Sequence, residues 1–224
     1  MKEKFVLVVF SLLVFSLSGC AYIEKARRAD ELEAENANLR NRIAQLQKEK
    51  TKEVQRVYEE KDRELSELER AKRELEESLK KEIGDYKAKL QMTERGLVIT
   101  FLSEVFFDSG KDIIKADGEL SLDKVAEVLN RDVPNSQVAV EGHTDNDPIK
   151  YSGWKSNWEL SSGRALAVVH YLIGECKVEP QRLSANGYGE YHPVAPNDTP
   201  QNKQKNRRVE IVILPSKISK MKAQ

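Results

Sequence analysis

Residues 138–149 read "VAVEGHTDNDPI" and contain both a strand pattern and a polar loop. The branched side chains of Val138 and Val140 alternate with their neighbours, which is the period of a β-strand with one buried face. The pattern ends before His143, so this histidine, Asp145 and Asp147 lie in a loop at the end of the strand. Loops in this position commonly carry ligand contacts on a rigid scaffold. The stretch therefore predicts a core strand followed by a candidate functional loop.

The next segment, "SNWELSSGRALAVVHYLIG" at 156–174, has the pattern of an amphipathic helix. Ser156 and Glu159 have the spacing of a capping box, and Gly174 is a typical helix stop. An apolar stripe faces one side of the helix. Its residues are Trp158, Ala165, Val169 and Leu172.

Four further segments complete the predicted domain. "GLVITFLSEVFFDSG" (96–110), "RLSANGYG" (182–189) and "RRVEIVIL" (207–214) have strand character, and "ADGELSLDKVAEVLN" (116–130) has helical spacing, with Asp117 as its expected cap. The order β-α-β-α-β-β predicts an α+β domain over 97–214, with helices on one face of a mixed sheet.

Upstream, residues 24–93 differ in composition because they are highly charged and contain no proline. Apolar residues recur there at heptad spacing, which predicts a long helical coiled coil that self-associates. The step from Ile43 to Val54 is a stutter, and Asn36 at a core position favours a fixed register. The heptad series are Ala29, Asn36, Ile43, Lys50 and Val57, with Leu32, Leu39 and Leu46, and then Val54, Lys61, Leu68 and Leu75, with Tyr58, Leu65, Lys72 and Leu79.

Two other structures compete for this segment. A single exposed charged helix gives no reason to bury the leucines, and a disordered polyampholyte would not keep them in register. At 1.5 Å per residue the helix would reach ~105 Å, which suits a spacer.

The first residues have the features of an export signal. Lys2 and Lys4 precede an apolar run from Phe5 to Leu17, which is short for a membrane span. The run ends in "LSGC", which resembles the bacterial lipobox. The resemblance implies a signal peptide at 1–19, a lipidated N-terminus at 20–23 with acyl chains such as palmitate on Cys20, and, because Ala21 is not aspartate, the outer membrane. An ordinary secretory peptide with a chance cysteine is the alternative.

Composition argues against several functional classes. The 37 basic and 37 acidic residues balance, which disfavours a nucleic-acid binder. His143 and Asp145 have no third metal ligand nearby, and no nucleophile and base are paired, so we expect neither a metal, a cofactor nor an enzyme. Cys176 stands without an intrachain disulfide partner once Cys20 is lipidated.

Asn157, Ser161 and Arg164 fall on one stripe of the predicted helix beside its apolar face. The Arg164 guanidinium can hold a carboxylate with two parallel bonds, and Asp145 can accept from an ammonium group. Together they would bind a zwitterionic amino-acid group. A structural ion pair between the arginine and a loop aspartate is the alternative.

The segments "VAVEGHTDNDPI", "SNWELSSGRALAVVHYL", "RLSANGYGEYHPVAPNDT" and "KNRRVEIVI" resemble, in order and spacing, the OmpA C-terminal-like domain of OmpA, Pal lipoproteins and MotB. The resemblance covers about 97–214 and implies non-covalent binding of diaminopimelate in peptidoglycan stem peptides. It places the ammonium-binding aspartate at Asp145 and the carboxylate-binding arginine at Arg164. Further pocket residues implied by the resemblance are Asn157, Leu160, Asp108 and either Arg207 or Arg208.

These features together predict a lipid-anchored protein on the periplasmic face of the outer membrane. It would be a homo-oligomer through its coiled coil, tethering that membrane to peptidoglycan, with a C-terminal tail at 215–224. The alternative is an envelope assembly protein whose coiled coil recruits a partner complex and whose OmpA-like domain anchors it to the wall. A MotB-type stator is less consistent with the sequence, because Phe5–Leu17 contains no acid.

Overall fold

The computed structural model describes residues 2–150 and 152–215, with side chains described from Tyr22 onward. The chain divides into two compact units, Met1–Glu60 and Lys61–Gln224. The lipidation predicted at Cys20, the side chains of the predicted signal peptide and residues 216–224 of the predicted tail lie outside the described residues. Within the described part of the chain, no helix offers an apolar stretch long enough to cross a membrane.

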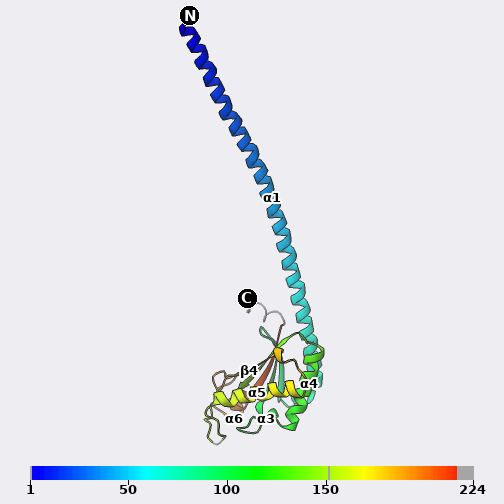
Figure 1. Cartoon of the computed structure of the whole chain (residues 1–224). Coiled ribbons are helices and arrows are strands. Elements are labelled where there is room, and N and C mark those ends of the chain that lie inside the picture. The colour runs from blue at the N-terminus through cyan, green and yellow to red at the C-terminus, as the bar shows by residue number, and fades with distance from the viewer. Residues whose placement is uncertain (1, 151, 216–224) are drawn as a thin grey trace. The chain divides into compact units, whose positions relative to one another are not determined.

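The first unit belongs to helix α1 (Lys2–Ser78; Figure 1). Its apolar heptad residues are exposed. Asn36 donates from its amide to the Leu32 carbonyl at 2.9 Å, one turn back. Exposed apolar side chains repeated along one helix are what an unpaired coiled-coil seam presents. They are Leu32, Leu39, Ile43, Leu46, Val54 and Val57.

The second unit begins within α1, where the exposure of the heptad residues changes. Leu68, Leu75 and Leu79 are buried in the domain core, with Ala71. The prediction of a coiled coil continuing to Thr93 is therefore wrong. These leucines keep the heptad spacing, but they pack on their own domain.

The residues that follow α1 do not continue the coiled coil. A short helix α2 (Lys80–Gly84) leads to strand β1 (Ala88–Thr93), which pairs antiparallel with β2 (Gly96–Leu102). Strand β1 was missed because its alternating apolar residues, Ala88, Leu90 and Met92, are not β-branched and its sequence continues the charged composition of the helix before it.

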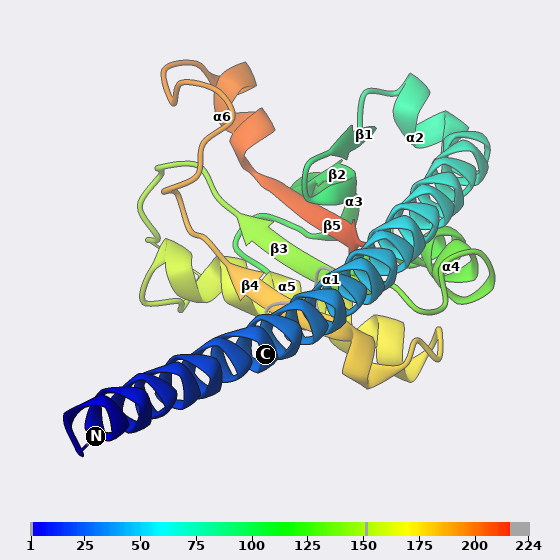
Figure 2. The ribbon, with the colours of Figure 1, turned by 90° about the horizontal axis from the view of Figure 1, so that it is seen from above.

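The sheet has five strands in the order β1-β2-β5-β3-β4 (Figure 2). Strand β3 (Gln137–His143) pairs parallel with β4 (Leu183–Gly187), and β5 (Arg208–Leu214) lies antiparallel between β2 and β3. The predicted α+β class with a mixed sheet is confirmed. The last strand of the chain occupies the centre, so residues from both ends of the domain meet there.

Helices α4 (Ala116–Arg131) and α5 (Asn157–Gly174) supply the apolar layer against the sheet (Figure 1). The Ser156 hydroxyl accepts from the Glu159 amide, which confirms the predicted cap of α5. The cap predicted at Asp117 is wrong, because Lys115 is the N-cap residue and Asp117 lies in the first turn of α4. Shorter helical turns are α3 (Ser103–Phe106), η1 (Pro180–Arg182) and α6 (Pro200–Asn206).

Two glycines bring α5 unusually close to the sheet. A Cβ at Gly142 on β3 would lie 2.1 Å from the Ser161 carbonyl oxygen, and one at Gly187 on β4 would lie 2.1 Å from the Ser162 hydroxyl. No other residue type fits at these contacts. They set α5 beside the loop that follows β3, where the candidate site lies.

Candidate functional site

A cavity of about 760 Å³ opens in the second unit. Its main walls are the 107–111 turn, the 144–150 loop after β3 and the first turns of α5, and Ser103, Glu104, Ser152 and Arg207 complete the lining. Six of the seven residues predicted as peptidoglycan-binding line it. These are Asp108, Asp145, Asn157, Leu160, Arg164 and Arg207.

Arg164 is the buried cation of this cavity, with only 4% of its surface exposed. Its Nε donates to the Lys111 carbonyl at 3.0 Å and its Nη2 to the Asp108 carbonyl at 3.1 Å. The guanidinium carbon lies 5.2 Å from the centre of the Phe107 ring. Backbone carbonyls thus orient the planar group without neutralising its charge, and Nη1 has no acceptor among the described residues.

Burial lowers the pKa of Arg164 to about 10, and the positive charge of Arg207 acts in the same direction. A buried charge without a bonded counter-ion is costly, so the site favours an anion that can pair with it. The structural ion pair between Arg164 and Asp145, considered from the sequence, is not made.

The Asp145 carboxylate is bound from two sides and is almost fully buried. Its Oδ1 accepts from the Asp147 amide at 3.1 Å, and its Oδ2 accepts from Nη1 of Arg207 at 2.5 Å. Arg207 therefore positions the aspartate within the cavity. Each carboxylate oxygen has two lone pairs, so Asp145 keeps acceptor capacity for a ligand.

Asn157 and Leu160 shape the wall that α5 contributes. The Asn157 amide nitrogen lies within 3.3 Å of the Asp145 carbonyl, 3.0 Å of the Asp147 carbonyl and 2.6 Å of Glu190 Oε2. This amide ties the polar loop to the helix, so its contribution is to hold the loop. Leu160 supplies a buried apolar surface beside it.

The sequence profile of the OmpA family matches residues 106–207. The periplasmic domain of Helicobacter pylori MotB is 31% identical, with a TM-score of 0.55, over 61% of this chain and 88% of that one.

Residues 106–207 form an OmpA-family domain.

Two other relatives extend this result. Motility protein B of Bacillus subtilis (strain 168) is 41% identical over 149 residues, which are 66% of this chain and 57% of that protein. The chain thus spans little more than half of that relative. A solved structure described as the cell wall anchor of the T6SS from Pseudomonas aeruginosa is 29% identical, with a TM-score of 0.57, over 63% of this chain and 96% of that one.

The two adjacent arginines of the OmpA domain, Arg207 and Arg208, take different positions. Arg207 lines the cavity, whereas Arg208 begins β5, is buried elsewhere and donates from Nε to Glu210 at 2.6 Å. Successive residues entering a strand point to opposite faces. Of the two candidates left open by the sequence, Arg207 lines the cavity and Arg208 does not.

Asp108 contributes mainly through its backbone. Its carbonyl orients Arg164, while its carboxylate is well exposed and lies 3.5 Å from Nζ of Lys111. Lys111 and Lys150 also line the cavity and were not predicted as site residues. Lysines in a charged surface loop give no distinguishing signal in the sequence.

Trp154 is a further contributor that sequence reasoning missed. Its Nε1 donates to the Gly110 carbonyl at 3.0 Å, and its ring would lie 2.8 Å from a Cβ at Gly163 of α5. The tryptophan thereby joins the 107–111 turn to the loop before α5. A large aromatic residue inside a polar loop was the available signal.

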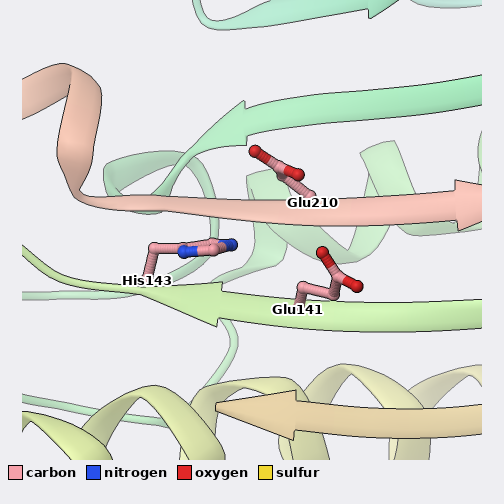
Figure 3. Close-up of side chains that lie close together, drawn as sticks. All are labelled: Glu141, His143 and Glu210. Carbon is pink, nitrogen blue, oxygen red and sulfur yellow. The ribbon is translucent and has the colours of Figure 1, made fainter. Parts of the chain in front are cut away.

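Beside the loop, a polar cluster consists of the buried Glu141 and His143 and the half-buried Glu210 (Figure 3). Their possible ligand atoms lie within 4.8 Å of one another, so the residue types would suit a metal ion. Glu141 and Glu210 are directly opposite in the register of β3 and β5. The sequence did not reveal this grouping, because Glu210 comes from the last strand of the domain.

Both carboxylates of this cluster are already bound by arginines. Arg95 donates to Glu141, and Arg208 donates to Glu210. The His143 ring stacks on Tyr188 at 5.1 Å between centroids, and burial lowers its pKa to about 3. Arg95, in the turn before β2, lies against Glu141 of β3 and Glu210 of β5, and Arg208 pairs with Glu210 within β5, so the cluster is an ionic network.

Proposed function

We propose that this protein is a cell-wall anchor whose OmpA domain binds the diaminopimelate of peptidoglycan stem peptides without covalent chemistry. The ligand's carboxylate would pair with Arg164, and its ammonium group would bind Asp145. The observation that carries the proposal is the oriented, buried guanidinium of Arg164 in a cavity that also holds a buried carboxylate. A solved relative described as a cell wall anchor supports it.

The chemistry of the ligand fits the charges that remain after internal pairing. Asp145 is paired with Arg207, Asp147 with Lys203 and Asp108 with Lys111, while Arg164 has no carboxylate bonded to it. The buried positive charge of Arg164 therefore favours binding of an anion in the cavity. Diaminopimelate provides a carboxylate and an ammonium on one carbon, whereas lysine in the same position of other cell walls lacks that carboxylate.

This difference gives a direct test. The full chain is mixed with purified sacculi of the diaminopimelate type and of the lysine type, and the bound fraction is measured after sedimentation. We expect binding only to the first, with free diaminopimelate as a competitor. Equal binding to both walls would refute the assignment of the carboxylate to Arg164.

Matched variants then assign the site. Asp145→Ala and Arg164→Ala should release the protein from diaminopimelate sacculi while its folded circular-dichroism spectrum persists. Arg208→Lys serves as the control, because Arg208 adjoins a site residue yet lies outside the cavity.

We further propose that the chain is an outer-membrane lipoprotein acylated at Cys20. The support is the basic, apolar and "LSGC" order of the first residues, followed by Ala21. Metabolic labelling with palmitate should mark the wild type and not Cys20→Ser, and membrane fractionation should place the wild type in the outer membrane. Label retained in the variant, or recovery in the inner membrane, would refute this part.

We also propose that α1 self-associates as a coiled coil. The exposed heptad residues from Leu32 to Val57 are the observation that supports it. Several wall-binding domains on one assembly would gain effective concentration on a polymeric ligand. Sedimentation equilibrium of the full chain should show an oligomer, and Leu39→Asp with Leu46→Asp should yield a monomer.

A second candidate function is favoured by the relatives. One is named as a motility protein and another as the anchor of the T6SS. In that case the α1 seam would recruit a partner complex, and the OmpA domain would fix the complex to the wall. Co-purification of a specific partner that is lost in the Leu39 and Leu46 variants would favour this candidate over a simple tether.

A further inference from the structure

Two aromatic side chains form an exposed stacked pair beside the candidate cavity. The rings of Trp158 and Tyr191 are 5.2 Å apart between centroids, with 23° between their planes. Trp158 is 46% exposed and Tyr191 is 61% exposed. Single exposed aromatic residues are ordinary, but two joined rings make one flat apolar face in contact with water.

The pair is connected to the wall of the cavity through Asn157. Trp158 follows Asn157, whose side chain lines the cavity, and Tyr191 follows Glu190, which accepts from the Asn157 amide at 2.6 Å. Both aromatic residues are therefore next in sequence to residues that meet at the cavity wall. Both rings are attached to backbone segments that the Asn157 side chain already connects.

The backbone beneath the rings is well fixed. The Gly189 amide donates to the Ser161 hydroxyl at 2.9 Å, and the Tyr191 amide donates to the Tyr188 carbonyl. Gly189 has a positive φ of 55°, and a Cβ there would lie 3.4 Å from the Trp158 amide nitrogen. This close turn holds Tyr191 against the first turn of α5, so the face is preformed.

We infer that Trp158 and Tyr191 bind an amino-sugar ring of the glycan strand that carries the stem peptide. This inference rests on the proposed function. In peptidoglycan, the side chain of diaminopimelate and two amino acids separate the end bound in the cavity from the sugar, a span of roughly 15–20 Å at full extension. A ligand held in the cavity can therefore place a sugar on the surface around its rim. The C–H face of a sugar ring suits an aromatic platform, and its hydroxyl groups suit polar surroundings.

The size and surroundings of the face favour a sugar over a protein or a membrane. Two rings cover at most a few hundred Å², whereas a stable protein interface buries about 1,000 Å² or more. Lys155 lies just before α5 and Glu159 in its first turn; their charged groups are 4.0 Å apart, with the side chains 89% and 41% exposed. Charged neighbours of this kind suit hydroxyl groups rather than lipid chains.

The test compares two soluble probes on the full chain in mild detergent by calorimetric titration. One is the stem tripeptide that ends in diaminopimelate, and the other is the same tripeptide attached to its disaccharide. We expect wild type to bind the disaccharide form about tenfold more tightly. Trp158→Ala and Tyr191→Ala should each remove this difference and leave the tripeptide affinity unchanged, while Trp158→Phe should keep part of it.

Leu166→Ala is the matched control, because Leu166 lies on the same helix and is also 46% exposed. It should preserve the tenfold difference. Equal affinity of wild type for both probes, or a difference that survives both aromatic variants, would overturn the inference and leave the proposed function standing. If wild type binds neither probe, the proposed function itself fails.

Discussion

Replacing Arg164 by lysine removes the planar guanidinium but keeps the positive charge, so it tests the geometry alone. Arg164 uses Nε and Nη2 to reach two carbonyls of the 108–111 turn and leaves Nη1 for the ligand. A lysine ammonium at the same position can keep a positive charge. It cannot bind two carbonyls and a carboxylate in one plane.

The expected loss follows from the bonds removed. A hydrogen bond to a charged group contributes ~1.5–3 kcal/mol, so losing one such bond to the ligand should weaken binding by roughly 10–150-fold. The fold should lose less, about 1–2 kcal/mol, because the ammonium can retain one carbonyl bond and still packs on Phe107. Calorimetric titration with the stem tripeptide measures the first quantity, and urea unfolding measures the second.

Arg131→Lys on α4 provides the control for a general arginine effect. Arg131 is exposed, pairs with Glu74 and Asp132 and lies outside the cavity. Its variant should bind as wild type does. Should Arg164→Lys bind the tripeptide with unchanged affinity, the reasoning about an oriented guanidinium would be wrong.

Three further predictions concern the domain itself. Leu75→Ala should lower the free energy of unfolding by ~2–5 kcal/mol in urea titrations, since Leu75 is fully buried, whereas a purely coiled-coil leucine would leave domain stability unchanged. Burial and the contact of the thiol with Asp123 raise the pKa of Cys176 to about 12, so alkylation of Cys176 at pH 8, followed by peptide mass spectrometry, should be about tenfold or more slower in the folded than in the unfolded protein. The pKa of His143 falls to about 3 in the folded state, so between pH 6.5 and 3 the unfolded chain binds a proton that the folded chain does not. The contribution of His143 to the free energy of unfolding should therefore be constant above pH 6.5 and decline as pH falls from 6.5 toward 3. In thermal unfolding curves, His143→Asn should flatten that decline. An equally steep acid decline in that variant would assign the effect to other groups.

The predicted elements of the sheet and its helices were largely recoverable because their signals are local. Val138 and Val140 alternate, and Ser156 caps the helix that follows. Period and capping act over a few residues, so they can be recognised in one dimension. Asp117 was placed wrongly because acidic residues are common both at caps and in first turns.

The residue at which the exposed apolar face of α1 ends could be found only from the tertiary structure. Leu46 and Leu75 share the heptad pattern, yet one is exposed and the other fully buried. Periodicity shows that a helix has an apolar face. It does not show whether a second chain or the helix's own domain covers that face.

By itself, the sequence determined the class of the domain, its family resemblance and the types of residue that could bind a zwitterion, because these depend on composition and short spacings. Only the tertiary structure decided how those residues are used. It pairs Asp145 with Arg207, holds Arg164 on backbone carbonyls and directs Arg208 away from the cavity. The physical reason is that the first two contacts join segments far apart in the chain, and their partners are chosen by the packing of α5 and β5 against the sheet. The third depends on the alternation of side chains along β5, which places Arg208 and Glu210 together.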